Sequence, residues 1–290
     1  MSKDIPFDDI VIGQELGPTE IPVNEEIVRA YCDEFKDYNP IYLSRLPFGG
    51  PVVPPLFQAT LHDLGLFRTK WDPHATVPSK TEHELINPAG IGKRLSATGK
   101  IIDKYIKRGR EYVVVQSVIV DEDGLEIRRC LDHVLLSLER TSRADTKPSS
   151  AINQSLGERG NSQGGSEIPS VVKVAYQRAL HENTFLPDSS HNEEYARSIG
   201  YPGRLVSGYV LCAYLSEMLL NFYGPGWLKG GKFLASFINK GVQEGDVVTC
   251  RGIVTDEVRE KAGKRVSLDI WMEKSQGLKV VVGEASGIRP

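Results

Sequence analysis

The sequence has few cysteines, and they lie far apart. The 290 residues include four of them, and no two form a CxxC pair: Cys32, Cys130, Cys212 and Cys250. Such spacing excludes a disulfide framework and a CxxC redox motif, and it favours reduced, buried thiols of an intracellular protein. The sequence also lacks the histidine, cysteine and carboxylate spacings of metal sites, so we expect no metal and no cofactor.

Long apolar runs and a strong charge of one sign are absent as well. The longest apolar stretch, LVSGYVLCAYLSEMLL, is interrupted by serine, glycine and glutamate, which favours a buried helix over a membrane span. The N-terminal MSKDIPFDDI lacks the apolar core of a signal peptide. The formal net charge of −3 gives no reason to expect nucleic acid or an anionic membrane as a partner. We therefore expect a cytoplasmic protein without a membrane or nucleic-acid partner.

A polar segment divides the chain into two halves of similar length. Residues 141–169 are rich in serine, glycine, asparagine and charged residues and lack apolar periodicity, which predicts a flexible linker. We accordingly expect one folded unit over residues 1–140 and a second over residues 170–290.

The two halves carry the same pattern. The segment INPAGIGKRLSATGKIID (86–103) is similar to INKGVQEGDVVTCRGIVTD (238–256), with glycines at matching spacings. Upstream of each lies an apolar stretch long enough for a buried helix, at 50–67 and 203–219. About four strand-like segments follow in each half. A long apolar helix followed by antiparallel strands predicts an α+β fold in which the sheet wraps around the helix.

With these motifs the chain resembles the MaoC-like double-hotdog proteins, the (R)-specific enoyl-thioester hydratase/dehydratase group. The resemblance covers both halves and rests on the segments DYNPIY, PVVPPLF, INPAGIG, NEEYARSIGYPGRLVSGYV and FINKGVQEGDVV. It implies a tandem double hotdog with two antiparallel sheets, each wrapped around a long central helix. It also implies a hydro-lyase that acts on a 2-enoyl or 3-hydroxyacyl thioester of CoA or acyl carrier protein.

In that family a loop with the pattern Asp-x-Asn-Pro-x-His supplies the acid/base groups, and a glycine N–H at the start of the helix holds the thioester oxygen. In the first half Asp37, Asn39 and Pro40 match the loop, but Tyr42 replaces the histidine. A phenol with a pKa near 10 is a poor base at neutral pH. Pro54-Pro55 stands where the family has His-Gly, and proline has no N–H to donate. Two interpretations stay open: a non-catalytic half widened to receive the acyl chain, and altered chemistry by Asp37 and Tyr42.

The second half keeps Ser207-Gly208 at the start of its predicted helix, so the resemblance implies one N–H for the oxyanion. In its loop Ser190 occupies the histidine position, His191 follows it, and Asp188 is the nearby carboxylate. His191 is thus the main candidate acid/base, with Asp188 or Ser190 as its helper, and a plain surface histidine is the alternative. The substrate-binding residues that we expect are Gly208, Ser207, Tyr209 and Asn39.

Two further histidines lie in strand-like segments. His83 and His133 alternate with apolar residues, and this alternation favours solvent-facing positions for both. We therefore expect neither of them to take part in chemistry.

Three functions are compatible with this pattern. The first is hydration or dehydration of an enoyl thioester. The second is a repurposed hotdog that cyclises, adds to or isomerises a polyketide-like biosynthetic intermediate by orienting it in an apolar cavity. The third is a non-catalytic subunit that binds acyl groups. The expected partners are an acyl-CoA, a substrate bound to acyl carrier protein or a small intermediate, and the sequence is compatible with a homodimer.

Overall fold

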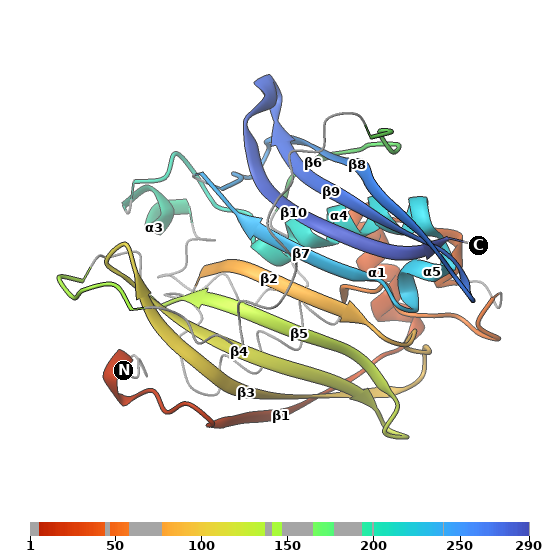
Figure 1. Cartoon of the computed structure of the whole chain (residues 1–290), viewed down its shortest axis with the longest axis horizontal. Helices are drawn as coiled ribbons and strands as arrows, with labels where there is room; N and C mark the ends of the chain where they lie inside the picture. The colour runs from red at the N-terminus through yellow and green to blue at the C-terminus, as the bar shows by residue number, and fades with distance from the viewer. Residues whose placement is uncertain are drawn as a thin grey trace.

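One antiparallel sheet of ten strands dominates the computed structural model (Figure 1). The structure describes residues 6–43, 47–57, 77–136, 141–146, 165–176, 193–198, 200–239 and 241–289. The first half supplies β1 (Glu15–Pro22), β2 (Val77–Leu85), β3 (Arg94–Lys107), β4 (Arg110–Asp121) and β5 (Glu126–Leu135). The second half supplies β6 (Val171–Val174), β7 (Lys232–Phe237), β8 (Val247–Glu260), β9 (Gly263–Lys274) and β10 (Lys279–Arg289). The order across the sheet is β1-β3-β4-β5-β2-β7-β10-β9-β8-β6.

The two halves meet where β2 pairs with β7. In this antiparallel pair Thr81 lies opposite Ala235, and His83 lies opposite Phe233. The structure therefore has one continuous sheet where the sequence predicted two. Each half covers one strand edge of the other, which removes two edges that would otherwise stay open to other chains. The outer strands β1 and β6 were not predicted, so each half has five strands rather than four.

The internal repeat corresponds to a structural repeat. The repeated segments lead into β3 and β8, and each of these strands has a register shift, just before Asp103 and just before Asp256. Gly92 and Gly245 precede the two strands with φ angles of 95° and 89°, a backbone conformation that favours glycine. The order β3-β4-β5-β2 in the first half is matched by β8-β9-β10-β7 in the second. Matching sequence positions therefore occupy matching places in the two halves.

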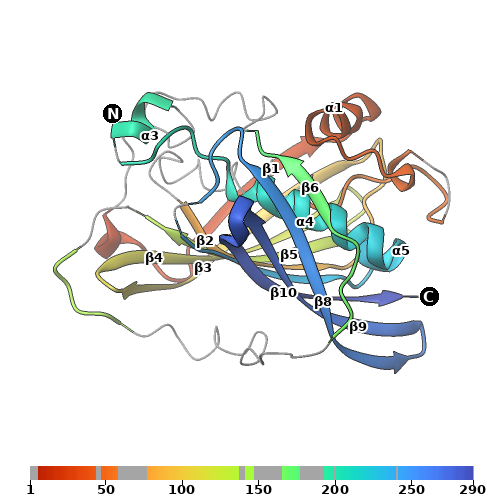
Figure 2. The same ribbon diagram turned by 90° about the horizontal axis from the view of Figure 1, so that it is seen from above.

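The main helix of the described chain is α4 (Gly208–Tyr223), which lies behind β7–β10 in Figure 1 and against the same sheet in Figure 2. It confirms the predicted apolar helix, which begins at Gly208 after the N-cap Ser207 and continues to Tyr223. The other described helices are α1 (Glu25–Phe35), α3 (Glu193–Ser198), α5 (Pro225–Leu228) and the short turns η1 (Phe7–Asp9), η2 (Pro40–Tyr42) and η5 (Ser275–Gly277). The helix predicted at 50–67 lies outside the described residues beyond Phe57.

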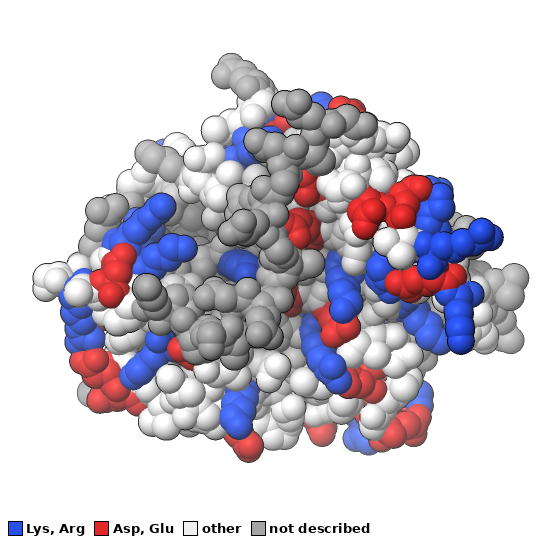
Figure 3. Space-filling model, in the orientation of Figure 1, with Lys and Arg blue, Asp and Glu red and all other residues white. Residues whose placement is uncertain are grey.

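Two surface properties bear on the expected partners. No helix among the described residues is long and apolar enough to cross a membrane. On the face shown in Figure 3, the basic and acidic side chains of the described residues intermingle, and neither sign dominates a large area. The described residues on this face therefore form no extended basic surface of the kind that binds nucleic acid.

We predict that the packing of α4 against the sheet is a main contribution to the stability of the fold. Leu215 on α4 is fully buried, whereas Leu278 beside η5 is 51% exposed. Leu215→Ala should lower the free energy of unfolding by about 2–5 kcal/mol, because it leaves a cavity in the core. Leu278→Ala is the matched control and should change it by about 0.5 kcal/mol or less. Denaturant unfolding followed by circular dichroism measures both, and equal effects would contradict this packing.

Candidate functional site

Asp37 is placed by the end of α1. The side-chain oxygen of Asn24 accepts a hydrogen bond from the Ile27 N–H at 2.8 Å and so caps the start of this helix. One face of α1 is buried in the core. The helix ends at Phe35, and the left-handed backbone of the next residue, Lys36 (φ 52°), turns the chain. The Asp37 N–H then donates to the Cys32 carbonyl at 3.2 Å, which holds Asp37 against the helix.

Asp37 and Tyr42 form a closed, buried pair. The Tyr42 hydroxyl donates to Asp37 Oδ2 at 2.6 Å, and the Asn39 N–H donates to Oδ1 at 3.3 Å. Asp37 is 3% exposed and Tyr42 is 1% exposed. Burial raises the pKa of Asp37, although the hydrogen bonds from Tyr42 and Asn39 oppose this. Burial, together with the charge of Asp37, raises the pKa of Tyr42 well above its usual value, so the phenol stays protonated and accepts no proton at neutral pH.

The segment beside this pair has no N–H at two neighbouring positions. The Val52 N–H donates to the Tyr42 carbonyl at 3.0 Å, which brings residues 52–55 next to the pair. Pro54 and Pro55 are both buried there, and neither has an N–H. The first half therefore lacks the donor that the resemblance implies at this position.

Two side chains of the second half contact the loop of the first. Lys173 on β6 donates from Nζ to the carbonyls of Phe35 and Lys36 at 3.0 and 2.9 Å. The same Nζ lies 2.6 Å from Glu217 Oε2 on α4. Asn39 Nδ2 donates to Asn221 Oδ1, also on α4, at 3.0 Å. The sequence did not single out Lys173 or Glu217, and its only signal was a glutamate inside an apolar stretch.

Glu217 has the most unusual titration of this group. Its pKa is raised to about 7, because burial and the charge of Asp37 raise it more than the hydrogen bond with Lys173 lowers it. A carboxyl group with this pKa exchanges its proton near neutral pH. Asp37 of the first half contributes to this shift of Glu217 in the second half by its negative charge.

The second-half helix begins with a glycine for a steric reason. A Cβ at Gly208 would lie 2.8 Å from the Phe237 ring and 3.1 Å from the Pro78 ring, so a larger residue would have to displace them. The Tyr209 N–H points towards the Ser207 hydroxyl at 3.4 Å. None of the hydrogen bonds among the described residues uses the Gly208 N–H. The start of α4 therefore offers a backbone donor.

The structure places the predicted residues in two separate groups. Asp37, Asn39 and Tyr42 lie together at the first-half loop, and residues 207–209 lie at the start of α4. His191, Asp188 and Ser190 lie outside the described residues. Glu217 is nine residues along α4 from Gly208, which corresponds to about 14 Å at the rise of an α-helix. The loop that carries Asp37 is bonded through Asn39 to Asn221, which lies in the later part of α4 and not at its start.

The solvent-facing positions predicted for His83 and His133 are wrong, because both side chains are buried. Arg128 Nη1 lies 3.1 Å from His83 Nδ1, and since arginine only donates, this nitrogen is the acceptor. His83 Nε2 then carries the hydrogen and donates to Thr81 Oγ1 at 2.9 Å. Burial lowers the pKa of His83 well below its usual value and that of His133 to about 4. Both rings are therefore neutral at physiological pH.

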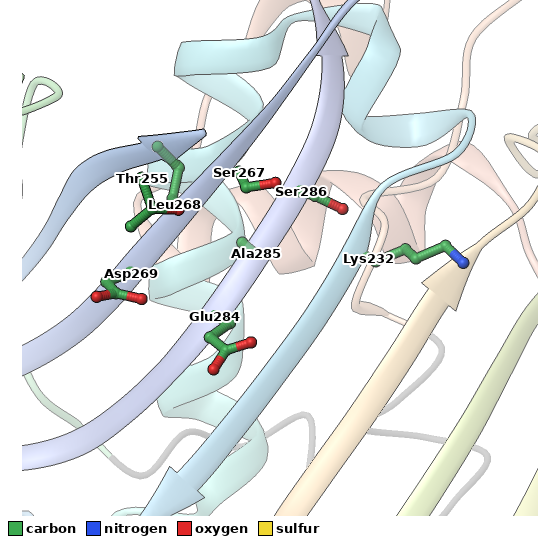
Figure 4. A pocket seen from close by; sticks show the side chains of 8 residues that line it. All are labelled: Lys232, Thr255, Ser267, Leu268, Asp269, Glu284, Ala285 and Ser286. Carbon is green, nitrogen blue, oxygen red and sulfur yellow. The ribbon is translucent and has the colours of Figure 1, made fainter. Parts of the chain in front are cut away.

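A surface hollow on the second half does not have the size of a site for an acyl thioester. It measures about 110 Å³ and is lined by residues of β7, β8, β9 and β10 (Figure 4). Ligand pockets usually measure about 300–1,000 Å³. No group of three or more potential metal ligands occurs among the residues that the structure describes.

Comparison with known proteins decides the fold. A scan against family models and a search of curated proteins both give no match. Solved structures do match. A MaoC-like dehydratase has a TM-score of 0.74 at 16% identity, with 96% of this chain and 98% of that chain covered. The chain has a double hotdog fold.

Two further solved structures support this assignment. A conserved hypothetical protein of Mycobacterium tuberculosis, described as a double hotdog, has a TM-score of 0.71 at 12% identity and covers 99% of this chain and 98% of its own. A MaoC-like dehydratase of Phytophthora capsici has a TM-score of 0.70 at 14% identity and covers 99% of this chain and 100% of its own. At such low identities the likeness establishes the double hotdog fold and leaves the activity to be argued from the residues.

The raised pKa of Glu217 predicts a pH-dependent contribution to stability. Since the pKa is higher in the folded state than the usual 4.5, this contribution is fully present below pH 4.5 and is lost as the pH rises to about 7. Relative to Glu217→Gln, the wild type should therefore lose stability over this range, by an amount on the order of 3 kcal/mol at most. Denaturant unfolding of both proteins between pH 4.5 and 8 measures the difference.

The matched control is Glu273→Gln. A hydrogen bond from Arg251 lowers the pKa of Glu273, so its contribution is already complete above pH 4.5 and should stay constant there. A constant difference between wild type and Glu217→Gln across the same range would show that Glu217 titrates normally.

Proposed function

We propose that this double hotdog protein is a hydratase/dehydratase-like enzyme of the cytoplasm that acts on a 2-enoyl or 3-hydroxyacyl thioester of CoA or acyl carrier protein. The observation that carries this proposal is the Gly208 N–H at the start of α4, to which no described residue offers an acceptor. The start of a helix carries a partial positive charge. A backbone donor at this place stabilises the negative charge that develops on a thioester oxygen when water adds.

The proposed chemistry belongs to the second half, taken as the unit 170–290 that follows the linker 141–169. His191 takes a proton from water as its oxygen bonds to the β carbon, and Asp188 or Ser190 orients the imidazole. The Gly208 N–H holds the enolate oxygen until the α carbon receives a proton. Ser207 and Tyr209 border this donor, and Tyr209 is itself buried in the core.

The first half supports this division of roles. Its carboxylate is buried and bonded to a tyrosine that stays protonated, and two prolines occupy the donor positions. The unit 1–140 then serves as the half that receives the acyl chain. Asn39 contacts the substrate at the surface of this unit.

The closed Asp37–Tyr42 pair favours a second candidate, a non-catalytic subunit that binds acyl groups. A buried carboxylate with its hydrogen bonds satisfied is not available for proton transfer to a substrate. A related alternative is a repurposed enzyme that cyclises or isomerises a polyketide-like intermediate by orientation. A chain that needs a co-expressed partner to stay monodisperse would favour the subunit.

Hydration of crotonyl-CoA and of a longer 2-enoyl-CoA tests the proposal. His191→Ala should lower the rate by about 100-fold or more, because general acid–base catalysis contributes this much. Gly208→Ala should also lower it, since the new methyl group would displace the Phe237 and Pro78 rings and move the N–H donor. His181 lies ten residues before His191 in the sequence and has no proposed role, so His181→Ala is the matched histidine control and should keep the wild-type rate.

Each outcome has a distinct meaning. Equal loss in the His191 and His181 variants would point to damage of the loop rather than to a catalytic histidine. An unchanged rate in the His191→Ala variant would show that the catalytic acid/base does not lie at His191 in the second-half loop. No turnover by the wild type on either substrate would exclude the hydratase function and leave the subunit and the repurposed enzyme.

A further inference from the structure

A second group of charged side chains lies between the two halves, away from the start of α4. It contains Asp37 from the first half, and Lys173 and Glu217 from the second. The proposed chemistry at Gly208 uses none of these three. Buried charges are costly to a fold unless they are paired, so such a cluster inside an otherwise apolar layer points to a function.

Lys173 fixes the geometry of this cluster. Its ammonium group has three N–H donors, and it contacts three acceptors, the Phe35 carbonyl, the Lys36 carbonyl and Glu217 Oε2. The first two acceptors belong to the turn that carries Asp37, and the third belongs to α4. Lys173 thus links the turn that carries Asp37 to Glu217 on α4 through a single ammonium group.

The cluster reaches the surface on one side. The Glu217 side chain is 13% exposed and that of Lys173 is 10% exposed. Beside them the Asn39 and Asn221 amides form a hydrogen bond that is open to solvent. Asp37 lies deeper, since it is almost fully buried. Glu217 is therefore the more exposed of the two carboxyl groups in this cluster.

The neighbours of Glu217 differ in their charge at neutral pH. Tyr31 and Tyr42 from the first half and Cys250 from β8 all interact with it electrostatically, and burial raises the pKa of each, so they stay neutral. Asp37 and Lys173 are the charged neighbours. Asp37 raises the pKa of Glu217, and Lys173 lowers it. Burial raises the pKa of both carboxyl groups of the cluster, Asp37 and Glu217.

We propose that Glu217 is a general acid/base in a second site, built between the two halves by Asp37, Lys173 and Glu217, which takes a neutral carbonyl compound through the rim formed by Asn39 and Asn221. Asp37 and Lys173 are positioning residues, because they set the orientation and proton occupancy of Glu217 without touching the ligand. The amides at the rim donate and accept hydrogen bonds, which suits a carbonyl oxygen and not a bare alkyl chain.

The reaction at this site is a proton transfer at carbon. The C–H bond next to the carbonyl breaks, its proton goes to a Glu217 oxygen, and its electron pair forms the enolate. Glu217 then returns a proton to the same carbon or to a conjugated one, so no oxidant, reductant or water is consumed. The inference rests on the proposed function only in naming an acyl thioester as the carbonyl compound.

Labelling with dicyclohexylcarbodiimide, which modifies protonated carboxyl groups, tests the site without a substrate. Peptide mapping at pH 6.5 should find the label on Glu217, and labelling should fall by about tenfold or more at pH 9, where the group is ionised. Glu273, whose pKa Arg251 lowers, should remain unlabelled at both pH values. Lys173→Met removes the ion pair and should keep Glu217 labelled at pH 8, above the range in which the wild type is labelled.

Hydrogen exchange of butyryl-CoA in deuterium oxide, followed by proton NMR, tests the chemistry. Glu217→Gln should lower the exchange of the α hydrogens by about 100-fold, and Glu217→Asp should keep part of it with a shifted pH profile. Glu273→Gln should exchange like the wild type. Circular dichroism of each variant confirms that the comparison is made between folded proteins.

The outcomes separate this inference from the proposed function. A folded wild type without label on Glu217 at pH 6.5 would overturn the site, and equal exchange by wild type and Glu217→Gln would overturn the role of Glu217 as base. An absence of exchange by the wild type would overturn the inference for acyl thioesters. Exchange that depends on Glu217, in a protein that does not hydrate crotonyl-CoA, would support this site and contradict the hydratase.

Discussion

The pairing of β2 with β7 is the contact on which the rest of the molecule depends. It joins two repeated halves into one sheet of ten strands, so that elements of one half lie against elements of the other. Because of this arrangement, α4 of the second half contacts the turn that follows α1 in the first, and Lys173 on β6 bonds to the end of α1. Neither contact is available to a half that folds alone.

A single helix then carries two different chemical environments. At its start, Gly208 presents a backbone N–H where close contact with Phe237 and Pro78 leaves room only for glycine. In its middle, Glu217 is the charged group in a stretch of buried apolar residues. A buried carboxyl with a raised pKa lowers stability at neutral pH. A sequence that keeps such a group in its core breaks the rule of an apolar interior, and functional sites are where this rule is most often broken.

Tyr42 closes the first-half loop without supplying a base. Its hydroxyl donates to Asp37 and so ties the two ends of the loop together. The proton, however, stays on the phenol, because burial and the neighbouring carboxylate both oppose its loss. In the segment beside this pair, Pro54 and Pro55 have no N–H to donate.

Local patterns in the sequence determined the repeat, the apolar helix α4, the strands β3 and β8 and the match of Asp37, Asn39 and Pro40 to a known loop, since these depend on neighbours along the chain. The tertiary structure decided that there is one sheet, that β1 and β6 form its outer strands and that His83 and His133 are buried. Alternation shows which residues share a face of a strand, but the burial of that face depends on what packs against it. The meeting of Asp37, Lys173 and Glu217 was likewise decided in three dimensions, because residues from three distant segments become neighbours only when the two halves join.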